Sequence, residues 1–563
     1  MKKILFLLSF AICGILNGQV PSWQWAETSS SNPFEAGGNS ISTDANNNVY
    51  VTGYFWDVSI TFGSTTLANS DVSGNTYDLF VVKYDNSGTV VWAKSAGGIG
   101  DDYGNSIHVD SLGFIYVAGE FSSPTITFGS TTLTNAGSSS GDVFVVKYDL
   151  SGNAIWAKGA TGTALDYVHG ITTDIYGNVY VVGDYGSNSF SFGSTTLTNI
   201  GSNGNDIFVT KYRSSGSLVW AKNFGNSDGG NQGFGIVTSG ANQVYITGNI
   251  HGTTTNFGAT TLTNTPGFYG DFFIAKIDSS GTALWAKSAG GINDDFGMGL
   301  TKDSNGNIYV TGDFQSASMI MGSTTLNNAD NSGTTYDLFI AKIDSSGNHI
   351  WANSIGGDGF DDFSFCITND ENSNLYLTGY FASNSVSFGT NTLTNSNYPF
   401  ADIFVAKYDV SGSATWAISV GGSDFDRGSG IATNSNNDLF VTGNFSSPTI
   451  SFGSTSLANT GISNIFTAKL NGITGIDNIT NNTYPILVFP NPFSSSTTIK
   501  TNKQLKNATL SISNLLGEEM ILVKNIFGEE IKISRENLPN GIYFLSVTED
   551  NKLIISEKLI IVD

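Results

Sequence analysis

The sequence is poor in several residue types, and each shortage excludes a class of protein. It holds 2 cysteines, 4 histidines and 10 prolines in 563 residues, and only 13% of its residues are charged. Cys13 lies in the N-terminal segment, so Cys366 stands alone, which excludes an intrachain disulfide and predicts a buried, inert thiol. The histidines do not recur at metal-ligand spacing. They stand at His108, His169, His251 and His349.

Long apolar runs are also missing, except at the N-terminus. The run Ile4–Ile15 is about a dozen residues long, short of the ~20 needed to cross a bilayer. Two lysines precede it and the small residue Gly18 follows it, so residues 1–18 are predicted to be a signal peptide cleaved near Gly18. A lipid anchor on Cys13 is the alternative. No transmembrane segment is predicted in the mature chain.

The charge is strongly one-sided. The formal net charge is −23, which repels phosphate backbones and excludes nucleic acid as a natural partner. The chain is instead rich in residues of strands and turns, with 67 Gly, 38 Phe and 22 Tyr. An all-β protein made of more than one folded unit is therefore expected.

Four sequence markers recur in seven units, at intervals of about 65 residues, with Met321 in place of the phenylalanine of the Phe-Gly pair in one unit. They are an aromatic-aliphatic-x-Gly segment, a Phe-Gly pair, a Phe three residues before a Lys, and a Trp-Ala pair. Each unit divides into four strands joined by Asp- and Gly-containing hairpin turns. The tryptophans are expected to cover the outer strand; a sugar-stacking surface is the alternative. They are Trp25, Trp92, Trp156, Trp220, Trp285, Trp351 and Trp416.

Four strands per unit, repeated radially, predict a seven-bladed β-propeller over residues 19–471. The chain enters this region with only a last strand, Trp23 to Ala26, and leaves it after a third strand, Ile465 to Leu470. Pairing the two would close the ring and remove two open sheet edges. A linear β-solenoid is the alternative, but it would gain nothing from that pairing.

The units resemble SBBP repeats, a bacterial β-propeller family. Segments that carry the resemblance include Asn307 to Gly312 and Asp337 to Lys342. The resemblance implies a fold and no particular reaction.

The chemistry changes after the repeats. Residues 472–484 are predicted to be a linker, and residues 485–563 to form a small Ig-like β-sandwich of seven short strands. This tail resembles the type A sorting domain of the type IX secretion system of Bacteroidota; an ordinary accessory sandwich is the alternative. The resemblance rests on motifs that include Pro490, Asn491, Pro492, Gly517, Gly541, Tyr543 and Lys558.

The sorting resemblance implies recognition by the type IX secretion machinery. It also implies a protein that is secreted, extracellular or attached to the outer cell surface.

Acidic residues follow most of the tryptophan strands, in loops that join one unit to the next. These loops are expected to lie on one face near the central channel, with the Phe-Gly hairpins rising from the same face. No cofactor is predicted, but the acids form a candidate rim for Ca²⁺ or another ligand; turn capping is the alternative. The rim residues are Asp101, Asp102, Asp166, Asp228, Asp294, Asp295, Asp361, Asp362, Asp424 and Asp426.

No catalytic motif emerges. The chain lacks a His-Glu-x-x-His zinc motif, a Gly-x-Ser-x-Gly elbow backed by a base, and a phosphate-binding loop. The sequence therefore favours a binding or adhesion module for an unidentified protein or glycan, and not an enzyme. Two alternatives are a secreted carbohydrate-active enzyme that uses the acidic loop face, and a structural surface protein without a ligand.

Overall fold

The computed structural model describes residues 21–563 apart from 31–33, 138–139, 202–203, 228, 241–242, 265–268, 331–332, 358, 472–485, 515–518 and 550–551. The predicted signal peptide and the predicted linker therefore lie outside the described residues. The chain divides into two compact units, residues 1–473 and 474–563. Among the described residues, no helix is long and apolar enough to cross a membrane.

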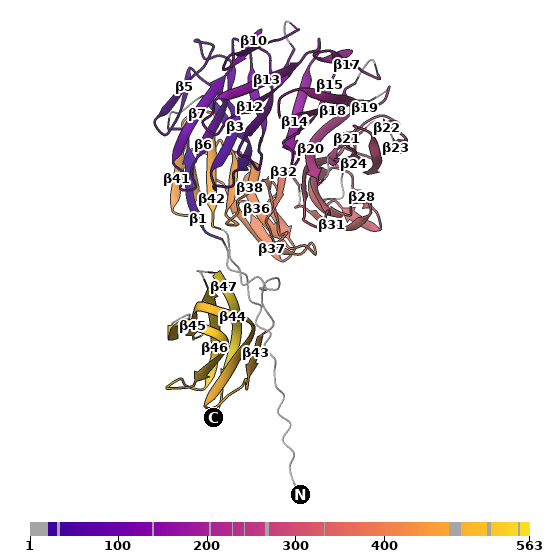
Figure 1. Cartoon of the computed structure of the whole chain (residues 1–563). Coiled ribbons are helices and arrows are strands. Elements are labelled where there is room, and N and C mark those ends of the chain that lie inside the picture. The colour runs from indigo at the N-terminus through magenta and orange to yellow at the C-terminus, as the bar shows by residue number, and fades with distance from the viewer. Residues whose placement is uncertain are drawn as a thin grey trace. The chain divides into compact units, whose positions relative to one another are not determined.

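The first unit is built from antiparallel four-stranded sheets, seven of them in the described part of the chain. The first strand of each sheet lies beside the first strand of the next sheet, and β38 in turn lies beside β2 (Figure 1). These innermost strands are β2 (Glu35–Thr43), β8 (Asp102–Val109), β14 (Asp166–Thr173), β20 (Gln232–Ser239), β26 (Asp295–Lys302), β32 (Asp362–Asn369) and β38 (Asp426–Thr433).

The second and third strands form the middle of each sheet and are almost completely buried. The second strands are β3 (Val49–Trp56), β9 (Ile115–Phe121), β15 (Val179–Tyr185), β21 (Gln243–Ile250), β27 (Ile308–Phe314), β33 (Leu375–Phe381) and β39 (Leu439–Phe445). The third strands are β6 (Tyr77–Tyr84), β12 (Asp142–Tyr148), β18 (Asp206–Tyr212), β24 (Asp271–Ile277), β30 (Asp337–Ile343), β36 (Asp402–Tyr408) and β42 (Asn464–Leu470).

The outer strands carry the tryptophans. They are β7 (Val90–Ala96), β13 (Ala154–Ala160), β19 (Leu218–Phe224), β25 (Ala283–Ala289), β31 (His349–Ile355), β37 (Ala414–Val420) and, in the last sheet, β1 (Trp23–Thr28).

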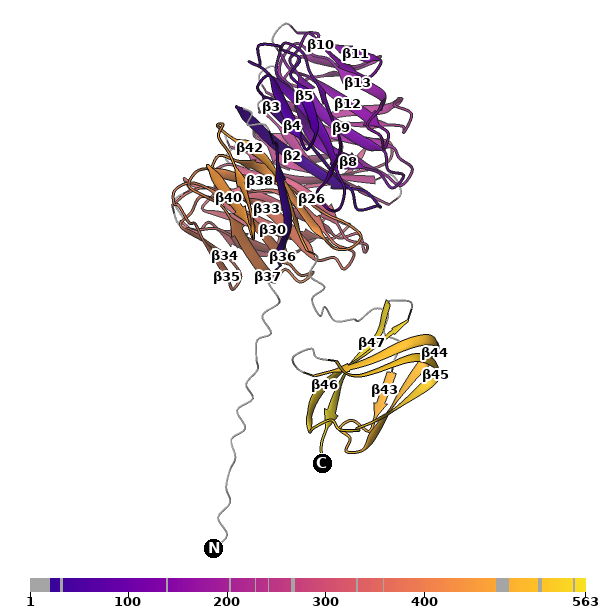
Figure 2. The same ribbon diagram turned by 90° about the vertical axis from the view of Figure 1, so that its left-hand side faces the viewer.

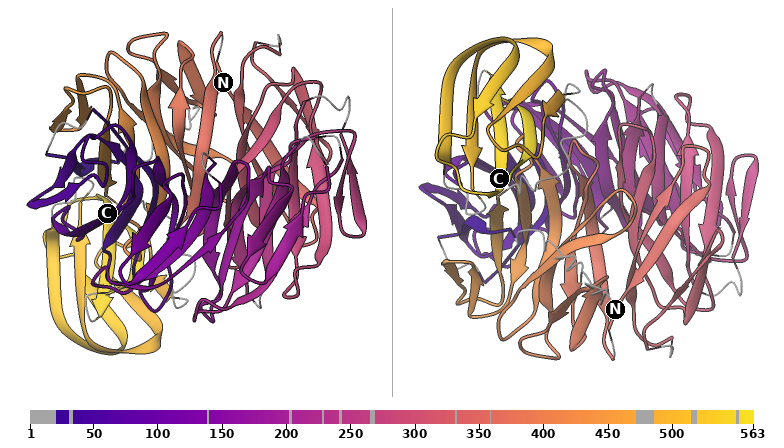
Figure 3. Two further views of the ribbon diagram at one scale, coloured as in Figure 1. Left: turned by 90° about the horizontal axis from the view of Figure 1, so that it is seen from above. Right: turned by 90° about the horizontal axis from the view of Figure 1, so that it is seen from below.

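The sheets form a propeller, as predicted. Viewed from above, the chain passes once around the unit, from the indigo sheet through the magenta sheets to the orange sheet beside the indigo one (Figure 3). The order of the last sheet is β1-β42-β39-β38, so the N-terminal strand completes the sheet of the last repeat. In that pairing Ala26 lies opposite Ala468 and Thr28 opposite Phe466. This pairing covers the edge of β42, which would otherwise be open.

A two-stranded hairpin joins the second and third strands of every sheet. The hairpins do not rise from the loop face as expected; each packs outward against the outer strand of its own sheet (Figure 2). They are β4 (Ser59–Phe62) with β5 (Thr65–Ala68), β10 (Thr125–Phe128) with β11 (Thr131–Thr134), β16 (Ser189–Phe192) with β17 (Thr195–Thr198), β22 (Thr254–Phe257) with β23 (Thr260–Thr263), β28 (Ser318–Met321) with β29 (Thr324–Asn327), β34 (Ser385–Phe388) with β35 (Asn391–Thr394), and β40 (Thr449–Phe452) with β41 (Thr455–Ala458).

The physical reason is apolar burial. Phe128 of β10 is 3% exposed, and its ring centroid lies 4.9 Å from that of Phe144 on the third strand of the same sheet. A hairpin standing in solvent would expose that ring, whereas folding it back buries a large apolar surface.

Each tryptophan joins its own sheet to the next one. Trp156 donates from Nε1 to the carbonyl of Ser214, which lies in the turn between the third and fourth strands of the following sheet, at 3.1 Å. Gly216 of that turn has φ +81°, and a Cβ there would stand 2.9 Å from the indole of Trp156. Glycine is needed for the conformation and for the space. Equivalent bonds start from Trp25, Trp92, Trp220, Trp285 and Trp351.

Trp416 is different. Its neighbour is the sheet closed by the N-terminal strand, where the third and fourth strands come from distant parts of the chain and no hairpin turn joins them. Its Nε1 is buried and has no hydrogen-bond partner among the described residues. The tryptophan contacts therefore follow the connectivity of the ring.

The tail differs from the seven short strands that were predicted. It forms one five-stranded sheet with the order β43-β44-β46-β47, in which β45 also pairs with β44. Two strands run through polar stretches that were expected to be turns, because irregular pairing around Leu505 and Ala508 lets them continue. The strands are β43 (Ile486–Phe489), β44 (Ser496–Ser513), β45 (Glu519–Ser534), β46 (Gly541–Glu549) and β47 (Lys552–Ile561).

Candidate functional site

Five of the predicted rim acids open an innermost strand and are buried. Asp102 is 0% exposed; its Oδ2 accepts hydrogen bonds from Ser123 Oγ at 2.6 Å and from the backbone N–H of Gly98 at 2.8 Å. A serine after the second strand plays the same part in the equivalent sheets. These acid–serine pairs are Asp166 with Ser187, Asp295 with Ser316, Asp362 with Ser383 and Asp426 with Ser447.

A second buried aspartate stands close to each of these acids. Burial, together with the neighbouring carboxylate of Asp78, raises the pKa of Asp102 to about 7. Burial and the carboxylate of Asp142 raise the pKa of Asp166 to about 7. Burial and the carboxylate of Asp402 raise the pKa of Asp426 to about 6. Carboxyl groups in such pairs tend to hold a proton near neutral pH.

Three of the other rim acids are partly exposed and bind the preceding sheet. Asp101 accepts a hydrogen bond from the backbone N–H of Tyr77 at 3.1 Å, Asp294 from Gly270 at 2.7 Å, and Asp361 from Tyr336 at 3.1 Å. Asp424 is exposed and accepts from the N–H of Phe425 at 2.8 Å. Asp228 lies outside the described residues.

These acids lie at the predicted loop end of the strands. Most of them accept hydrogen bonds from other residues of the propeller and so stabilise the fold. Among the described residues, no group of three or more His, Cys, Asp or Glu side chains is arranged to hold a metal ion. Calcium binding at the rim stays a prediction.

Partly exposed aromatic side chains gather at the same end of the innermost strands. We call them the aromatic belt. One arc begins at Phe34 and Trp56, whose ring centroids lie 4.7 Å apart, and continues through Tyr77 to Tyr103 at 5.2 Å. The arc consists of Phe34, Tyr54, Trp56, Tyr77 and Tyr103.

A longer arc of the belt crosses five sheets. His169 lies 4.9 Å from Phe234 between ring centroids, and Tyr336 lies 5.0 Å from Phe363. Contiguous apolar surface of this kind marks binding sites on soluble proteins. This arc consists of Tyr167, His169, Phe234, Phe296, Tyr336, Phe363, Phe365, Tyr380 and Phe425.

The belt breaks the repeat. The buried acid that opens the innermost strand recurs in five sheets, whereas the next residue is one of five types in the seven sheets. Strand pairing aligns these variable positions. They hold Gly37, Tyr103, Tyr167, Gln232, Phe296, Phe363 and Arg427.

Arg427 is the cation of the belt. Its guanidinium carbon lies 4.0 Å above the ring of Phe365, and its Nε is buried without a hydrogen-bond partner in the part of the chain that the structure describes. Burial lowers the pKa of Arg427, and the phenols of Tyr54 and Tyr380 oppose that effect. Among the described carboxylates none forms an ion pair with it, so its charge is available to a ligand.

A polar cluster interrupts the belt between the second and third sheets. His169 Nε2 lies 2.8 Å from Asp184 Oδ1, and Asp184 is 0% exposed. Asn105 donates to Glu120 at 3.4 Å. Burial raises the pKa of Glu120 to about 7, and the charge of Asp184 also raises it. A carboxyl group poised near neutrality is a possible proton donor.

In the tail, the structure brings the predicted sorting residues of its two ends together. Asn491, between Pro490 and Pro492, donates from Nδ2 to the carbonyl of Lys558 at 2.7 Å and accepts from the N–H of Ile560 at 2.8 Å. Tyr543 is 5% exposed and donates from Oη to the carbonyl of Pro539 at 3.0 Å. Gly541 opens β46, and Gly517 lies outside the described residues.

The belt does not follow from the repeat, because its residues differ between the sheets. A signal was present: an aromatic residue or arginine directly follows Asp102, Asp166, Asp295, Asp362 and Asp426. Cys366 stays a free thiol whose pKa is raised by burial, and its Sγ lies 3.8 Å from the carbonyl of Ile431.

Two parts of the chain match known families. Residues 487–562 match the secretion system C-terminal sorting domain, and residues 91–120 match the SBBP β-propeller repeat. Both resemblances expected from the sequence are confirmed. The type IX sorting tail marks the protein as secreted and either attached to the cell surface or released.

Similarity to individual proteins is weak. The uncharacterized WD repeat-containing protein L264 of Acanthamoeba polyphaga mimivirus is 25% identical over 506 residues, covering 74% of this chain. The match spans 35% of the length of that relative.

Two solved structures are also similar. PorZ, a surface component of the type IX secretion system of Porphyromonas gingivalis, has 10% identity and a TM-score of 0.21, covering 93% of this chain and 81% of PorZ. The phage phi92 endosialidase has 10% identity and a TM-score of 0.38, covering 96% of this chain and 87% of the endosialidase. Such scores do not establish a common function, and the propeller assignment rests on the sheets themselves.

Proposed function

We propose that this protein is a binding module of the cell exterior that holds a glycan or a protein against its aromatic belt. The matched tail and the arrangement of the sheets identify a secreted β-propeller with a type IX sorting tail. A propeller built from such repeats also fits a module without enzymatic activity.

One observation carries the proposal. Side chains that hold the sheets together repeat around the ring, whereas those of the belt vary and stay partly exposed. A position that only packs adjacent sheets should carry the same residue type in every sheet. Aromatic rings supply large contact area with little loss of side-chain entropy, and Arg427 adds a charge for orientation.

The test uses the full mature chain on a glycan array and in pull-downs of proteins from the cell surface. Phe365→Ala and Arg427→Gln should each weaken binding about tenfold or more, as expected at the centre of an interface. Ile155→Ala is the matched control, because Ile155 is a 50% exposed residue on the outer strand β13. Equal binding by all three variants would reject the belt as the binding surface.

The second candidate is a secreted carbohydrate-active enzyme. It is favoured by one observation, the raised pKa of Glu120 beside His169 and Asp184. A polysaccharide-degradation screen separates the two candidates. Product release that is abolished by Glu120→Gln would establish the enzyme, and binding without any product supports the module.

A further inference from the structure

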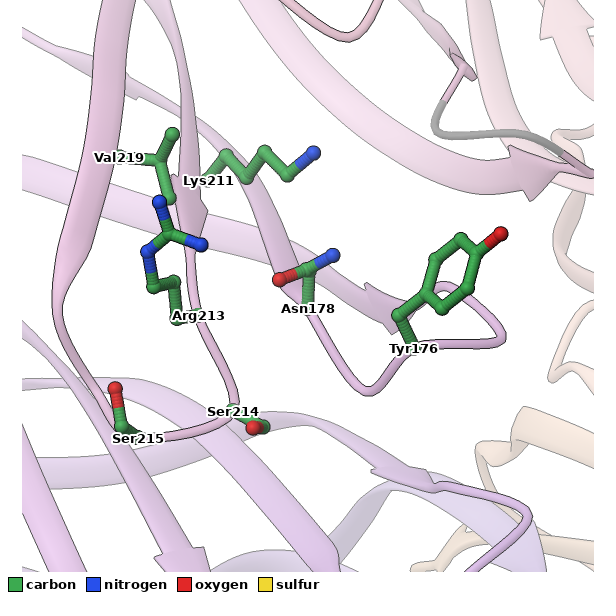
Figure 4. Close-up of a pocket in the computed structure, with 7 residues that line it drawn as sticks. All are labelled: Tyr176, Asn178, Lys211, Arg213, Ser214, Ser215 and Val219. Carbon is green, nitrogen blue, oxygen red and sulfur yellow. The ribbon is translucent and has the colours of Figure 1, made fainter.

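A second candidate site lies at the opposite end of the strands from the belt. It is a pocket of about 560 Å³ between two turns of the third sheet (Figure 4). The turn between β14 and β15 contributes Tyr176 and Asn178. The turn between β18 and β19, with the residues beside it, contributes Lys211, Arg213, Ser214, Ser215 and Val219.

Arg213 breaks the repeat at this pocket. Five other sheets have aspartate at the start of the same turn, and that carboxylate caps the turn. Asp149, for example, accepts from the backbone N–H groups of Ser151 and Asn153 at 2.9 Å. A guanidinium has no acceptor, so Arg213 gives up these bonds and their contribution to folding. The five aspartates are Asp85, Asp149, Asp278, Asp344 and Asp409.

Lys211 is buried and lacks an acceptor. It is 7% exposed, and its ammonium lies over the ring of Tyr180, 5.0 Å from the centroid. The equivalent Lys147 donates to the carbonyl of Ser214, and Lys276 to that of Ser345, each at 3.2 Å. Lys211 makes no such bond to any residue that the structure describes, and neither does the equivalent Lys83 of the first sheet, which lies over the ring of Tyr50. The ammonium of Lys211 lines the pocket and is therefore free to donate to a ligand there.

The positive charges of Lys211 and Arg213 exceed the negative charge of Asp174 beside them. Asp174 raises the pKa of Lys211, whereas burial and the charge of Arg213 lower it. The carboxylate of Asp174 already accepts from the N–H groups of Tyr176 and Asn178 at 2.9 Å and from Tyr180 Oη at 3.2 Å. The pocket therefore keeps a positive balance within a chain whose net charge is −23.

An exposed aromatic ring stands beside the cations. Tyr176 is 64% exposed, on a turn where the other sheets carry smaller residues such as Asn46, Asn305 and Asn372. Ser214, Ser215 and Asn178 add hydroxyl and amide groups. This set offers a flat apolar face, hydrogen-bonding groups and a cationic pair in one place.

We propose that this pocket binds the carboxylate-bearing sugar of an acidic glycan. Arg213 pairs with the sugar carboxylate, Lys211 donates its free N–H groups to the same ligand, and the ring of Tyr176 covers a face of the sugar. The proposal does not depend on the proposed function, because it concerns other residues at the other end of the strands.

A single sugar acid fits this site better than a polyanion does. The net charge of −23 repels nucleic acids and highly phosphorylated chains over long range, while a local pair of cations holds one carboxylate. An exposed tyrosine has no role with a small inorganic anion.

The test is calorimetric titration of the full mature protein with trigalacturonic acid. We expect binding in the millimolar range or tighter and about tenfold weaker binding of the trimethyl ester, which keeps the shape of the ligand and removes its charge. Arg213→Asp should weaken binding of the acid about tenfold or more. That variant restores the repeat residue, so it should keep or raise the melting temperature.

Three controls complete the design. Lys287→Asp makes the same change of charge at an exposed residue of an outer strand and should leave binding within about twofold. Phe365→Ala in the belt should have no effect on trigalacturonate, which separates this site from the proposed function. Sodium acetate and inorganic phosphate test for a simple anion site.

The proposal is overturned if the protein does not bind the trisaccharide or binds the ester as tightly. It is also overturned if Arg213→Asp leaves binding unchanged, or if acetate or phosphate binds as tightly as trigalacturonate.

Discussion

The outer and inner strands of the propeller follow different rules. Six outer strands carry a tryptophan bonded to the next sheet, and the turns that receive these bonds contain the same glycine. The innermost strands share a buried acid in five sheets but vary at the next residue. Uniformity marks the residues that hold the ring together, and variation marks those free to contact a ligand.

Opening the ring should have the largest effect. Deleting residues 19–30 removes β1 and with it the pairing to β42 and the contact of Trp25 with Asn86. We expect the free energy of unfolding to fall by about 5 kcal/mol or more, because the apolar strand β42 loses its outer neighbour and its edge becomes exposed.

Chemical denaturation followed by tryptophan fluorescence measures this loss. Deleting residues 552–563 is the control, because these residues belong to the tail and should leave the propeller transition unchanged. An unchanged transition after loss of β1 would show that ring closure does not stabilise the propeller.

Lowering the pH should stabilise the propeller. The buried aspartates have raised pKa values in the folded state, about 7 for Asp102, Asp166 and Asp295, against 3.8 for an ordinary aspartate. The folded state therefore binds more protons than the unfolded state between these values, and the stability gained is lost as the pH rises through about 7.

The melting temperature should accordingly rise as the pH falls from 8 to 5. It should fall again near pH 4 and below, because the turn aspartates such as Asp149 have lowered pKa values and lose their bonds on protonation. Asp102→Asn with Asp166→Asn should flatten the rise, since Asn231 occupies the same position in the fourth sheet. A melting temperature that rises from pH 5 to pH 8 would contradict this assignment.

The tryptophans allow a finer comparison. Trp220→Phe and Trp416→Phe remove the same atoms from equivalent outer strands, but only Trp220 donates a hydrogen bond, to Ser279 at 2.9 Å. Trp220→Phe should therefore cost about 1 kcal/mol more than Trp416→Phe. Urea denaturation of the two variants measures the difference. Equal losses would mean that the bonds to the next sheet add no net stability.

Much of the fold could be predicted, because neighbouring sheets pack in the same way and therefore need the same residue types about every 65 residues. The vacancy left by the missing last strand predicted the pairing of Trp23–Thr28 with β42. The outward fold of the hairpins could not be read from the repeat, because it depends on where Phe128 finds apolar partners in three dimensions. In the tail, β44 and β45 were each predicted as two shorter strands, because polar residues near Leu505 continue the strand through irregular pairing.

The belt was not predicted from the sequence, and ligand binding at the predicted acidic rim stays a prediction. The loops after the tryptophan strands do meet at one end of the ring, yet acids such as Asp102 and Asp362 are used inside the fold. The belt could not be predicted from the repeat, because Tyr103, Phe296 and Arg427 occupy equivalent positions but are different residue types.

One measurement tests most directly whether the belt serves binding and not folding. Gln232 shows that the fold accepts glutamine at the variable position of the innermost strand. A variant with glutamine at Tyr103, Tyr167, Phe296, Phe363 and Arg427 should unfold cooperatively in denaturant, within about 2 kcal/mol of the parent, since these side chains are only half-buried. A variant that no longer folds would show that the belt belongs to the core, and the account would fail.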